Sequence, residues 1–230
     1  MIIGSGLLAN AFSRDYLHHE DVCIYAAGVS NSNCIDIREF ARERERLENA
    51  LRQTTYSDVF VYFSTCSVFD HELLNTPYVQ HKLKMEAMVR LHSRNLILRL
   101  PQVAGKIANP HTLLNFIYAR ILHGERFNLW CNAKRNIIDI DDIVSIANQL
   151  IGNKSLRNIT LNIANVVNYS IYEIVKAMEL AVGREGVYNV VPRGYEYNID
   201  VSNIYTVLEK LEIKFDNHYL EKTVNKYHKI

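Results

Sequence analysis

The chain opens with Met1-Ile2-Ile3-Gly4-Ser5-Gly6-Leu7-Leu8-Ala9, and the expected fold follows from these residues. A short apolar strand runs directly into the pattern G-x-G-x-x-A, which begins a helix. Gly4 permits a tight turn, Gly6 lets a phosphate approach the backbone, and Ala9 allows the helix to pack closely on the strand. The first backbone amides of such a helix also attract an anion. The pattern predicts a phosphate-binding turn, and an ordinary glycine turn is the alternative.

Beyond this turn, apolar runs of strand length alternate with segments of helical periodicity. Strands are expected at residues 1–3, 22–27, 59–63, 96–100, 136–140 and 160–164, and helices at 7–17, 37–53, 77–92, 111–123, 141–152, 170–182 and 202–211. This alternation is typical of an α/β protein, with a mostly parallel sheet and helices on both faces. We expect residues 1–230 to form a single domain, in which residues from about 106 onward build a smaller lobe.

The expected helix over 77–92 has the clearest start. Thr76 suits the N-cap position and Pro77 suits the first helical position. Apolar residues at steps of four are expected to face inward, and these are Val79, Leu83, Ala87 and Leu91. In the preceding helix, charges of both signs alternate from Arg38 to Glu48, which is typical of a solvated face.

The charge of the chain is nearly balanced, since 26 Lys and Arg residues face 25 Asp and Glu residues. This balance argues against a dedicated nucleic-acid binder. No apolar run is long enough to span a membrane and no signal peptide is evident, so we expect a cytoplasmic protein without a membrane partner. The four cysteines have no paired spacing and are expected to be reduced and buried, and no metal site is expected.

Thr65, Tyr78 and Lys82 form a candidate set for proton transfer. Tyr78 and Lys82 are four residues apart, so both project from one face of the expected helix. Thr65 lies at the carboxyl end of a strand, where open α/β sheets bind their ligands. A nearby ammonium lowers the pKa of a tyrosine, and a hydroxyl orients the oxygen that gains or loses the proton. An ordinary helix surface with an exposed Tyr and Lys is the alternative.

Six segments of the chain carry a joint pattern. They are Gly4–Ala9 (a glycine motif), Tyr25–Ser30 (similar to H-x-A-A-x-x-S), Ser64–Phe69 (S-[ST]-x-x-V-[YF]), Pro77–Glu86 (P-Y-x-x-x-K-x-x-x-E), Leu98–Gly105 (L-R-x-x-N-V-Y-G) and Arg135–Asp142 (R-x-F-I-H-V-x-D). Together they resemble the extended short-chain dehydrogenase/reductases, the family of NAD-dependent nucleotide-sugar epimerases and dehydratases. The resemblance covers nearly the whole chain and implies a Rossmann-like parallel sheet with a small C-terminal substrate lobe.

The resemblance also implies a cofactor, NAD or NADP, and a nucleotide-sugar substrate. Tyr78 would be the catalytic acid/base, Lys82 its partner and a ligand of the nicotinamide ribose, and Thr65 the catalytic hydroxyl. The implied cofactor-binding residues are Gly4, Ser5, Gly6, Leu7, Leu8, Ala26, Ala27, Gly28, Tyr78, Lys82, Pro101 and Val103, and the implied substrate-binding residues are Gln102 and Arg135. Because the family often dimerises through the helix that carries the tyrosine, a homodimer is implied.

The chain departs from the family pattern on the adenosine side of the cofactor. The segment Tyr25–Ser30 follows the first helix directly, so the family's second and third strands are missing and the sheet is expected to be reduced at one edge. The strand over 22–27 also lacks the acidic residue that would hold the adenosine ribose. Gln102 replaces the usual Asn. The loss of the adenosine wall weakens the expected dinucleotide pocket and not the expected sugar-nucleotide pocket.

The sequence therefore predicts an NAD(P)-dependent nucleotide-sugar epimerase or 4-keto-sugar reductase of surface polysaccharide biosynthesis. Dehydration is disfavoured, because Cys66 and Ser67 stand where the family's dehydratases carry Asp-Glu. The alternative is a degenerate family member that binds a sugar nucleotide or a protein partner without redox chemistry. A third hypothesis is that a second subunit completes the cofactor site.

Several candidate residues also have ordinary interpretations. Arg135 could be an exposed charge before a strand. Cys66 is interpreted as a packing thiol rather than a nucleophile, because no base is evident beside it. Asp141 and Asp142 are interpreted as carboxylates at a helix N-terminus rather than as metal ligands.

Overall fold

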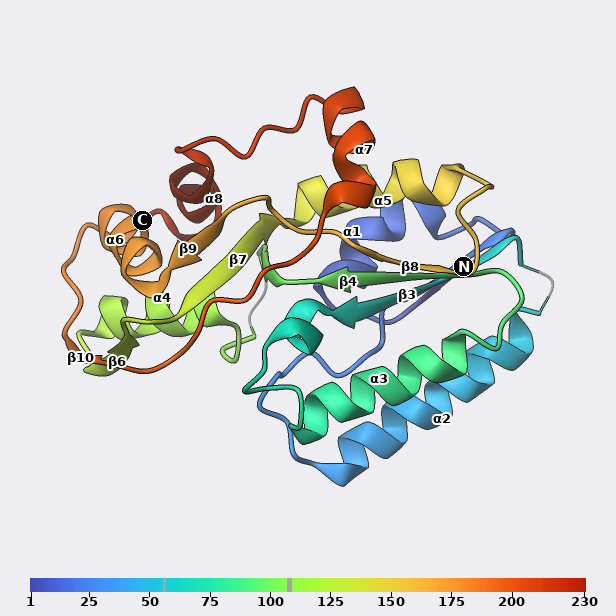
Figure 1. Ribbon diagram of the computed structural model, residues 1–230, viewed down its shortest axis with the longest axis horizontal. Coiled ribbons are helices and arrows are strands. Elements are labelled where there is room, and N and C mark those ends of the chain that lie inside the picture. Colours follow the sequence, from blue (N-terminus) through green and yellow to red (C-terminus); the bar gives the residue numbers. More distant parts are fainter. Residues whose placement is uncertain (56, 107–108) are drawn as a thin grey trace.

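The computed structural model describes residues 1–55, 57–106 and 109–230. Within these residues the main layer is a parallel sheet in the order β1-β2-β3-β4-β8 (Figure 1). Its strands are β1 (Ile2–Ile3), β2 (Val22–Tyr25), β3 (Val59–Thr65), β4 (Asn95–Leu100) and β8 (Ile159–Asn162). Every residue of β3 is buried, as expected for a central strand covered on both faces.

Helices cover both faces of this sheet. On one face, α1 (Leu7–Tyr16) and α5 (Ile140–Gly152) pack against the apolar side chains of the strands. On the other face lie α2 (Ile37–Gln53) and α3 (Pro77–Val89), which Figure 1 shows running side by side. The predicted α/β fold with helices on both faces is confirmed. None of the described helices is both long enough and apolar enough to cross a membrane.

The sheet is reduced at one edge, as predicted. In a complete Rossmann sheet the first strand lies in the middle, with strands on both sides. Here β1 pairs only with β2 among the described residues, so the strands on one side are missing. The crossovers β1-α1-β2 and β2-α2-β3 step in the same direction while their helices lie on opposite faces, so the two have opposite hands. One of them is therefore of the rare left-handed kind.

A second group of elements surrounds a core of its own. Its described strands are β5 (Gln102–Ala104), β6 (Phe127–Trp130), β7 (Lys134–Asp139), β9 (Asn168–Ser170) and β10 (Tyr188–Val191). The strands pair in the order β5-β7-β9 and as β6 with β10, and α4 (Leu113–His123), α6 (Ile171–Val182) and α8 (Tyr219–His228) pack with them. This separate core supports our proposal of one domain with a smaller C-terminal lobe. However, α5, β8 and α7 (Tyr205–Lys210) return to the main sheet.

The buried face of α3 differs from the prediction. The helix begins at Pro77 as expected, and the Thr76 hydroxyl accepts a hydrogen bond from the Val79 amide. Its buried residues, however, are Tyr78, Val79, His81, Lys82, Met85, Glu86 and Val89. Leu91 lies beyond the end of the helix and is 87% exposed, and Ala87 is also exposed. Steps of four drift around a helix of 3.6 residues per turn, and the polar residues of α3 are buried because they find charged partners.

The cysteines fit the prediction only in part. All four are free thiols, and Cys23 and Cys66 are buried. Cys34 is half-buried, and Cys131 is exposed directly after β6. The prediction that all four are buried is therefore wrong for Cys131, which lies in the smaller lobe.

Candidate active site

A cleft of about 350 Å³ lies at the carboxyl ends of the strands of the main sheet. It brings together all the predicted site residues except Arg135. They are Gly4, Ser5, Gly6, Leu7, Leu8, Ala26, Ala27, Gly28, Thr65, Tyr78, Lys82, Pro101, Gln102 and Val103. Because they come from separate turns, strands and helices, the fold alone brings them to one place.

At one end of the cleft, the glycine turn has the backbone that a phosphate site needs. Gly4 has φ +138°, and a side chain there would place its Cβ 2.4 Å from the carbonyl oxygen of Ala26. Gly6 is the N-cap of α1, and no described side chain accepts a hydrogen bond from the amides of that first turn. A Cβ on Gly6 would meet no described atom within 4 Å, so the space beside these amides is open. The turn fits the diphosphate of a dinucleotide.

Two arginines of α2 line the same cleft, in a chain whose strand over 22–27 lacks the acidic residue expected for the adenosine ribose. Arg42 forms an ion pair with Glu39. Arg46 makes no hydrogen bond or ion pair with the described residues that would neutralise it. Sequence reasoning assigned the charged face of this helix to solvent, and its Arg44–Glu48 pair at 2.9 Å agrees with that. The arginines instead give the open flank of the cleft a positive charge.

Tyr78 and Thr65 meet inside the cleft. Tyr78 lies in the first turn of α3, Thr65 is the last residue of β3, and both side chains are buried. Burial raises the pKa of Tyr78, a hydrogen bond with Thr65 lowers it, and the nearby charge of Glu43 raises it. The net shift is well upward. The prediction of a lowered pKa is therefore wrong for the protein alone, because burial outweighs the hydrogen bond with Thr65 and the charge of Glu43 adds to the upward shift.

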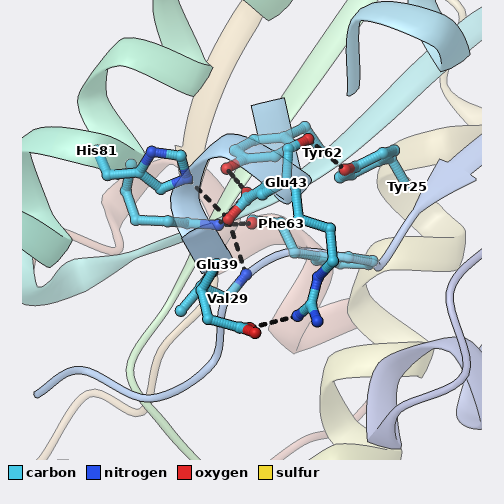
Figure 2. Close-up of polar contacts among 9 residues, drawn as sticks. Tyr25, Val29, Glu39, Glu43, Tyr62, Phe63 and His81 are labelled. Atoms are coloured by element: carbon cyan, nitrogen blue, oxygen red, sulfur yellow. Dashed lines mark hydrogen bonds and ion pairs between the residues drawn. The ribbon is translucent and has the colours of Figure 1, made fainter. Parts of the chain in front are cut away.

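The carboxylate of Glu43 lies beneath the cleft, and its side chain is 1% exposed. It accepts four hydrogen bonds, from the Val29 amide at 2.7 Å, the Tyr62 hydroxyl at 2.8 Å, His81 Nε2 at 2.9 Å and Lys82 Nζ at 3.2 Å. Figure 2 shows Glu43 at the centre of these contacts. A Cβ on Gly28 would lie 2.8 Å from Lys82 Nζ and 2.9 Å from a carboxylate oxygen of Glu43, so a side chain there would displace one end of the pair.

Glu43 is ionised despite its burial. Burial alone would raise the pKa of its carboxyl group, but the Lys82 charge and the hydrogen bonds from His81 and Val29 lower the pKa to about 2. Lys82 Nζ also donates to the Phe63 carbonyl at 3.2 Å and lies 4.6 Å from the centre of the Tyr62 ring. The ammonium is thereby held in place from three sides.

Sequence reasoning missed Glu43, although α2 contains a signal for it. Glu43 is three residues after Phe40, four before Leu47 and seven before Ala50, so it falls on the apolar stripe of the helix. Leu47 and Ala50 are buried and Phe40 stacks on the His81 ring. A carboxylate at a buried position needs a partner, but nothing local in the sequence names Lys82 as that partner.

The sequence matches no known family model and no curated protein sequence. Among solved structures, UDP-glucuronic acid 4-epimerase from Bacillus cereus, in complex with UDP-glucuronic acid and NAD, has a TM-score of 0.75 with 18% identity. The match covers 96% of this chain and 77% of that one. The chain has the epimerase fold.

Two more solved structures share the epimerase fold with this chain. UDP-glucose 4-epimerase from Thermotoga maritima, solved with UDP-glucose, has a TM-score of 0.71 and 21% identity over 95% of this chain and 79% of that one. dTDP-glucose 4,6-dehydratase from Bacillus anthracis, in complex with NAD, has a TM-score of 0.68 and 15% identity over 96% and 77%. At such identities the likeness establishes the fold, and chemistry has to be argued from the residues of the cleft.

Arg135 is the one predicted site residue that is not among the described residues lining the cleft. In this epimerase fold it lies on β7, where its guanidinium donates to the carbonyls of Lys134 at 2.8 Å and Tyr195 at 3.2 Å. It also lies 4.0 Å from Asp70. The side chain is half-buried among these partners, so its role toward a substrate stays a prediction.

The remaining candidates take their ordinary roles. Burial raises the pKa of the Cys66 thiol, which disfavours a thiolate nucleophile. Asp141 and Asp142 lie in the first turn of α5, after the N-cap Asp139. Lys226 of α8 donates to Asp139 and Asp141, so these carboxylates also dock the last helix. Among the described residues no group of three or more His, Cys, Asp or Glu side chains could hold a metal ion.

Proposed function

We propose that this chain is an NAD(P)-dependent nucleotide-sugar epimerase or 4-keto-sugar reductase. One observation carries the proposal: a single cleft holds both the glycine turn and the Thr65–Tyr78–Lys82 set. The shared fold supports it, since the similar structures include enzymes solved with NAD and with UDP-sugars. A role in surface polysaccharide biosynthesis would follow from such a substrate.

Each residue of the cleft then has a defined task. The amides at the start of α1, beside Gly4 and Gly6, would bind the cofactor's diphosphate. The cofactor, when bound, supplies or accepts a hydride at a sugar carbon. Tyr78 would transfer the proton of the sugar oxygen, and Thr65 would hydrogen-bond that oxygen. Lys82, held by Glu43 and Phe63, would position the nicotinamide ribose.

The sugar nucleotide would bind between the cleft and the smaller lobe. Gln102 of β5 lines the cleft and starts the chain's path into that lobe. We propose that it contacts the sugar and that Arg135 reaches the diphosphate once its present carbonyl contacts are exchanged. We further propose a homodimer formed through α2 and α3, which sedimentation would detect.

The open flank beside β1 favours one alternative. The described part of the chain has no strand beyond β1 to hold the adenosine half, so a protein that binds sugar nucleotides without redox chemistry is the second candidate. The Thr65–Tyr78–Lys82 set in the cleft argues for the first candidate, because a protein without redox chemistry has no need of all three.

Calorimetric titration with NADH and NADPH tests the proposal. We expect binding in the micromolar range or tighter, after a check that no cofactor has co-purified. Hydride transfer is then followed at the nicotinamide absorbance, with NAD⁺ or NADP⁺ and UDP-glucose in one arm and with NADH or NADPH and a UDP-linked 4-keto sugar in the other. A folded protein that binds neither dinucleotide at millimolar concentration would contradict the redox function and favour the second candidate.

A further inference from the structure

The position of Glu43 allows it to do more than stabilise the fold. It is the centre of a buried network that joins α2 to β3, to α3 and to the loop after β2. Two of its partners, His81 and Lys82, are neighbours on the helix that carries Tyr78. Its negative charge therefore contacts Lys82 and acts on Tyr78, two of the residues proposed for proton transfer.

Burial and the charges around Tyr78 together set the protonation state of the phenol. The titratable and charged groups that face this network come from every element packed around it: Glu43, Arg42 and Arg46 from α2, Tyr25 from β2, Tyr62 from β3, His81 and Lys82 from α3, and Cys66 after β3. Of these, Lys82 carries the positive charge that would favour a phenolate, and Glu43 lies 3.2 Å from it. The pair is neutral as a whole, so little of the lysine's charge remains to act on the phenol.

We propose that Glu43 is a positioning residue that neutralises Lys82 and keeps Tyr78 a protonated phenol, so that the enzyme's substrate is a keto sugar nucleotide which it reduces. This inference rests on the proposed function and goes beyond it, because it chooses reduction over epimerisation. Epimerisation begins with oxidation of an alcohol and needs a phenolate to accept the proton. Ketone reduction needs the phenol itself.

The step balances with these groups. The carbonyl carbon receives a hydride, with its electron pair, from NADH or NADPH, which is oxidised, and a new C–H bond forms. The π electron pair of the carbonyl moves onto its oxygen. That oxygen takes the proton of Tyr78 as the phenolic O–H bond breaks, and solvent later returns a proton to Tyr78.

Titration of Tyr78 in the protein without cofactor tests the inference independently of activity. The protein is labelled with ¹³Cζ-tyrosine, and Tyr78→Phe assigns the resonance. In the unsubstituted chain we expect Tyr78 to stay protonated through neutral and moderately alkaline pH. In Glu43→Gln we expect the midpoint of its ionisation to fall by about one pH unit or more, because Lys82 then acts on the phenol without a counter-charge. The alkaline limb of the pH profile for ketone reduction should move down by the same amount.

Two further variants separate charge from packing. Glu86→Gln removes another buried carboxylate of α3, one that pairs with Arg99 and Arg90 instead of Lys82, and it should leave the Tyr78 midpoint unchanged. Tyr62→Phe removes one hydrogen bond of Glu43 but keeps its charge, and should shift the midpoint little. Equal midpoints in Glu43→Gln and the unsubstituted chain would overturn the inference. Should Glu43→Gln fail to fold, a Tyr78 midpoint near neutral pH in the unsubstituted chain would overturn it as well.

The same measurements distinguish this inference from the proposed function. A chain that binds dinucleotide, and that oxidises UDP-glucose with NAD⁺ or NADP⁺ faster than it reduces a keto sugar with NADH or NADPH at neutral pH, would leave the proposed function standing and overturn the inference. A chain that binds neither dinucleotide would overturn both.

Discussion

The two ends of the cleft differ in the groups that they present. At one end the glycine turn presents backbone amides. At the other end Tyr78 and Lys82 present side chains, and Lys82 is hydrogen-bonded to Glu43 of another helix. The first end depends on space, because Gly4 and Gly6 work by lacking a side chain. The second end depends on charge, because the state of each group follows from its neighbours. Substitutions at the turn should therefore act through sterics, and those at the far end through electrostatics that vary with pH.

The largest effect is expected from Tyr78→Phe, which removes the proton that the charged end of the cleft controls. Turnover should fall by about a thousandfold, while calorimetric affinity for the sugar nucleotide stays similar, because general acid catalysis contributes to the transition state. Tyr172→Phe, on the exposed side of α6, is the matched control and should be silent. Unchanged turnover in Tyr78→Phe would refute the role of Tyr78 in proton transfer.

The next effect concerns the stability of the charged end in acid. The pKa of Glu43 is about 2 in the folded chain against an ordinary value of 4.5. Because its folded pKa is depressed, its contribution to stability is complete above pH 4.5 and is lost as the pH falls from there toward 2. The loss should amount to about 3 kcal/mol of unfolding free energy.

Urea unfolding followed over this pH range measures that loss. Glu43→Gln should be less stable than the unsubstituted chain at neutral pH, and the difference between the two should shrink as the pH approaches 2. A difference that stays constant over the whole range would mean that Glu43 contributes packing only.

At the other end of the cleft, two alanine substitutions separate backbone strain from ligand binding. Gly4→Ala should destabilise the fold by about 2 kcal/mol, because φ +138° and the Ala26 carbonyl exclude a Cβ. Gly6→Ala meets open space, so its melting temperature should match the unsubstituted chain while affinity for NADH or NADPH falls about tenfold. Thermal melts and calorimetry check both. If Gly6→Ala binds dinucleotide normally, the turn is an ordinary turn.

The smallest effect is expected from Arg46, the exposed arginine of α2 that lines the cleft. Arg46→Ala should weaken NADPH binding about fivefold at low salt, and the effect should fade as salt rises, because the charge is exposed. Arg44→Ala is the control, since Arg44 pairs with Glu48 and does not line the cleft. Equal losses in the two variants would show a general effect of charge rather than contact with a phosphate.

The sequence predicts those parts of the fold that depend on residues close to one another in the chain. The start of α3 follows from Thr76 and Pro77, and the buried β3 follows from an unbroken apolar run. In contrast, α8 was missed. It is a largely polar helix that is held by contacts far along the chain, such as Tyr219 with Asp142 at 2.6 Å. No local pattern reports such a contact.

The candidate site divides in the same way. The glycine turn, Thr65, Tyr78 and Lys82 are recognisable because their chemistry depends on residue type and short spacing. The roles of Glu43 and Arg46 are not, because both lie in a run of charges that is typical of a solvated face until the helix is placed against the sheet and the cleft.

By itself, the sequence determined the α/β alternation, the phosphate turn and the residues available for proton transfer, because each depends on groups only a few positions apart. Only the tertiary structure decided the protonation state of Tyr78 and the counter-ion of Lys82. Glu43 and Lys82 are 39 residues apart in the chain and 3.2 Å apart in space. The pKa of a buried group depends on its burial and on such distances in space, because the loss of water disfavours its charged form and weakens the screening of nearby charges.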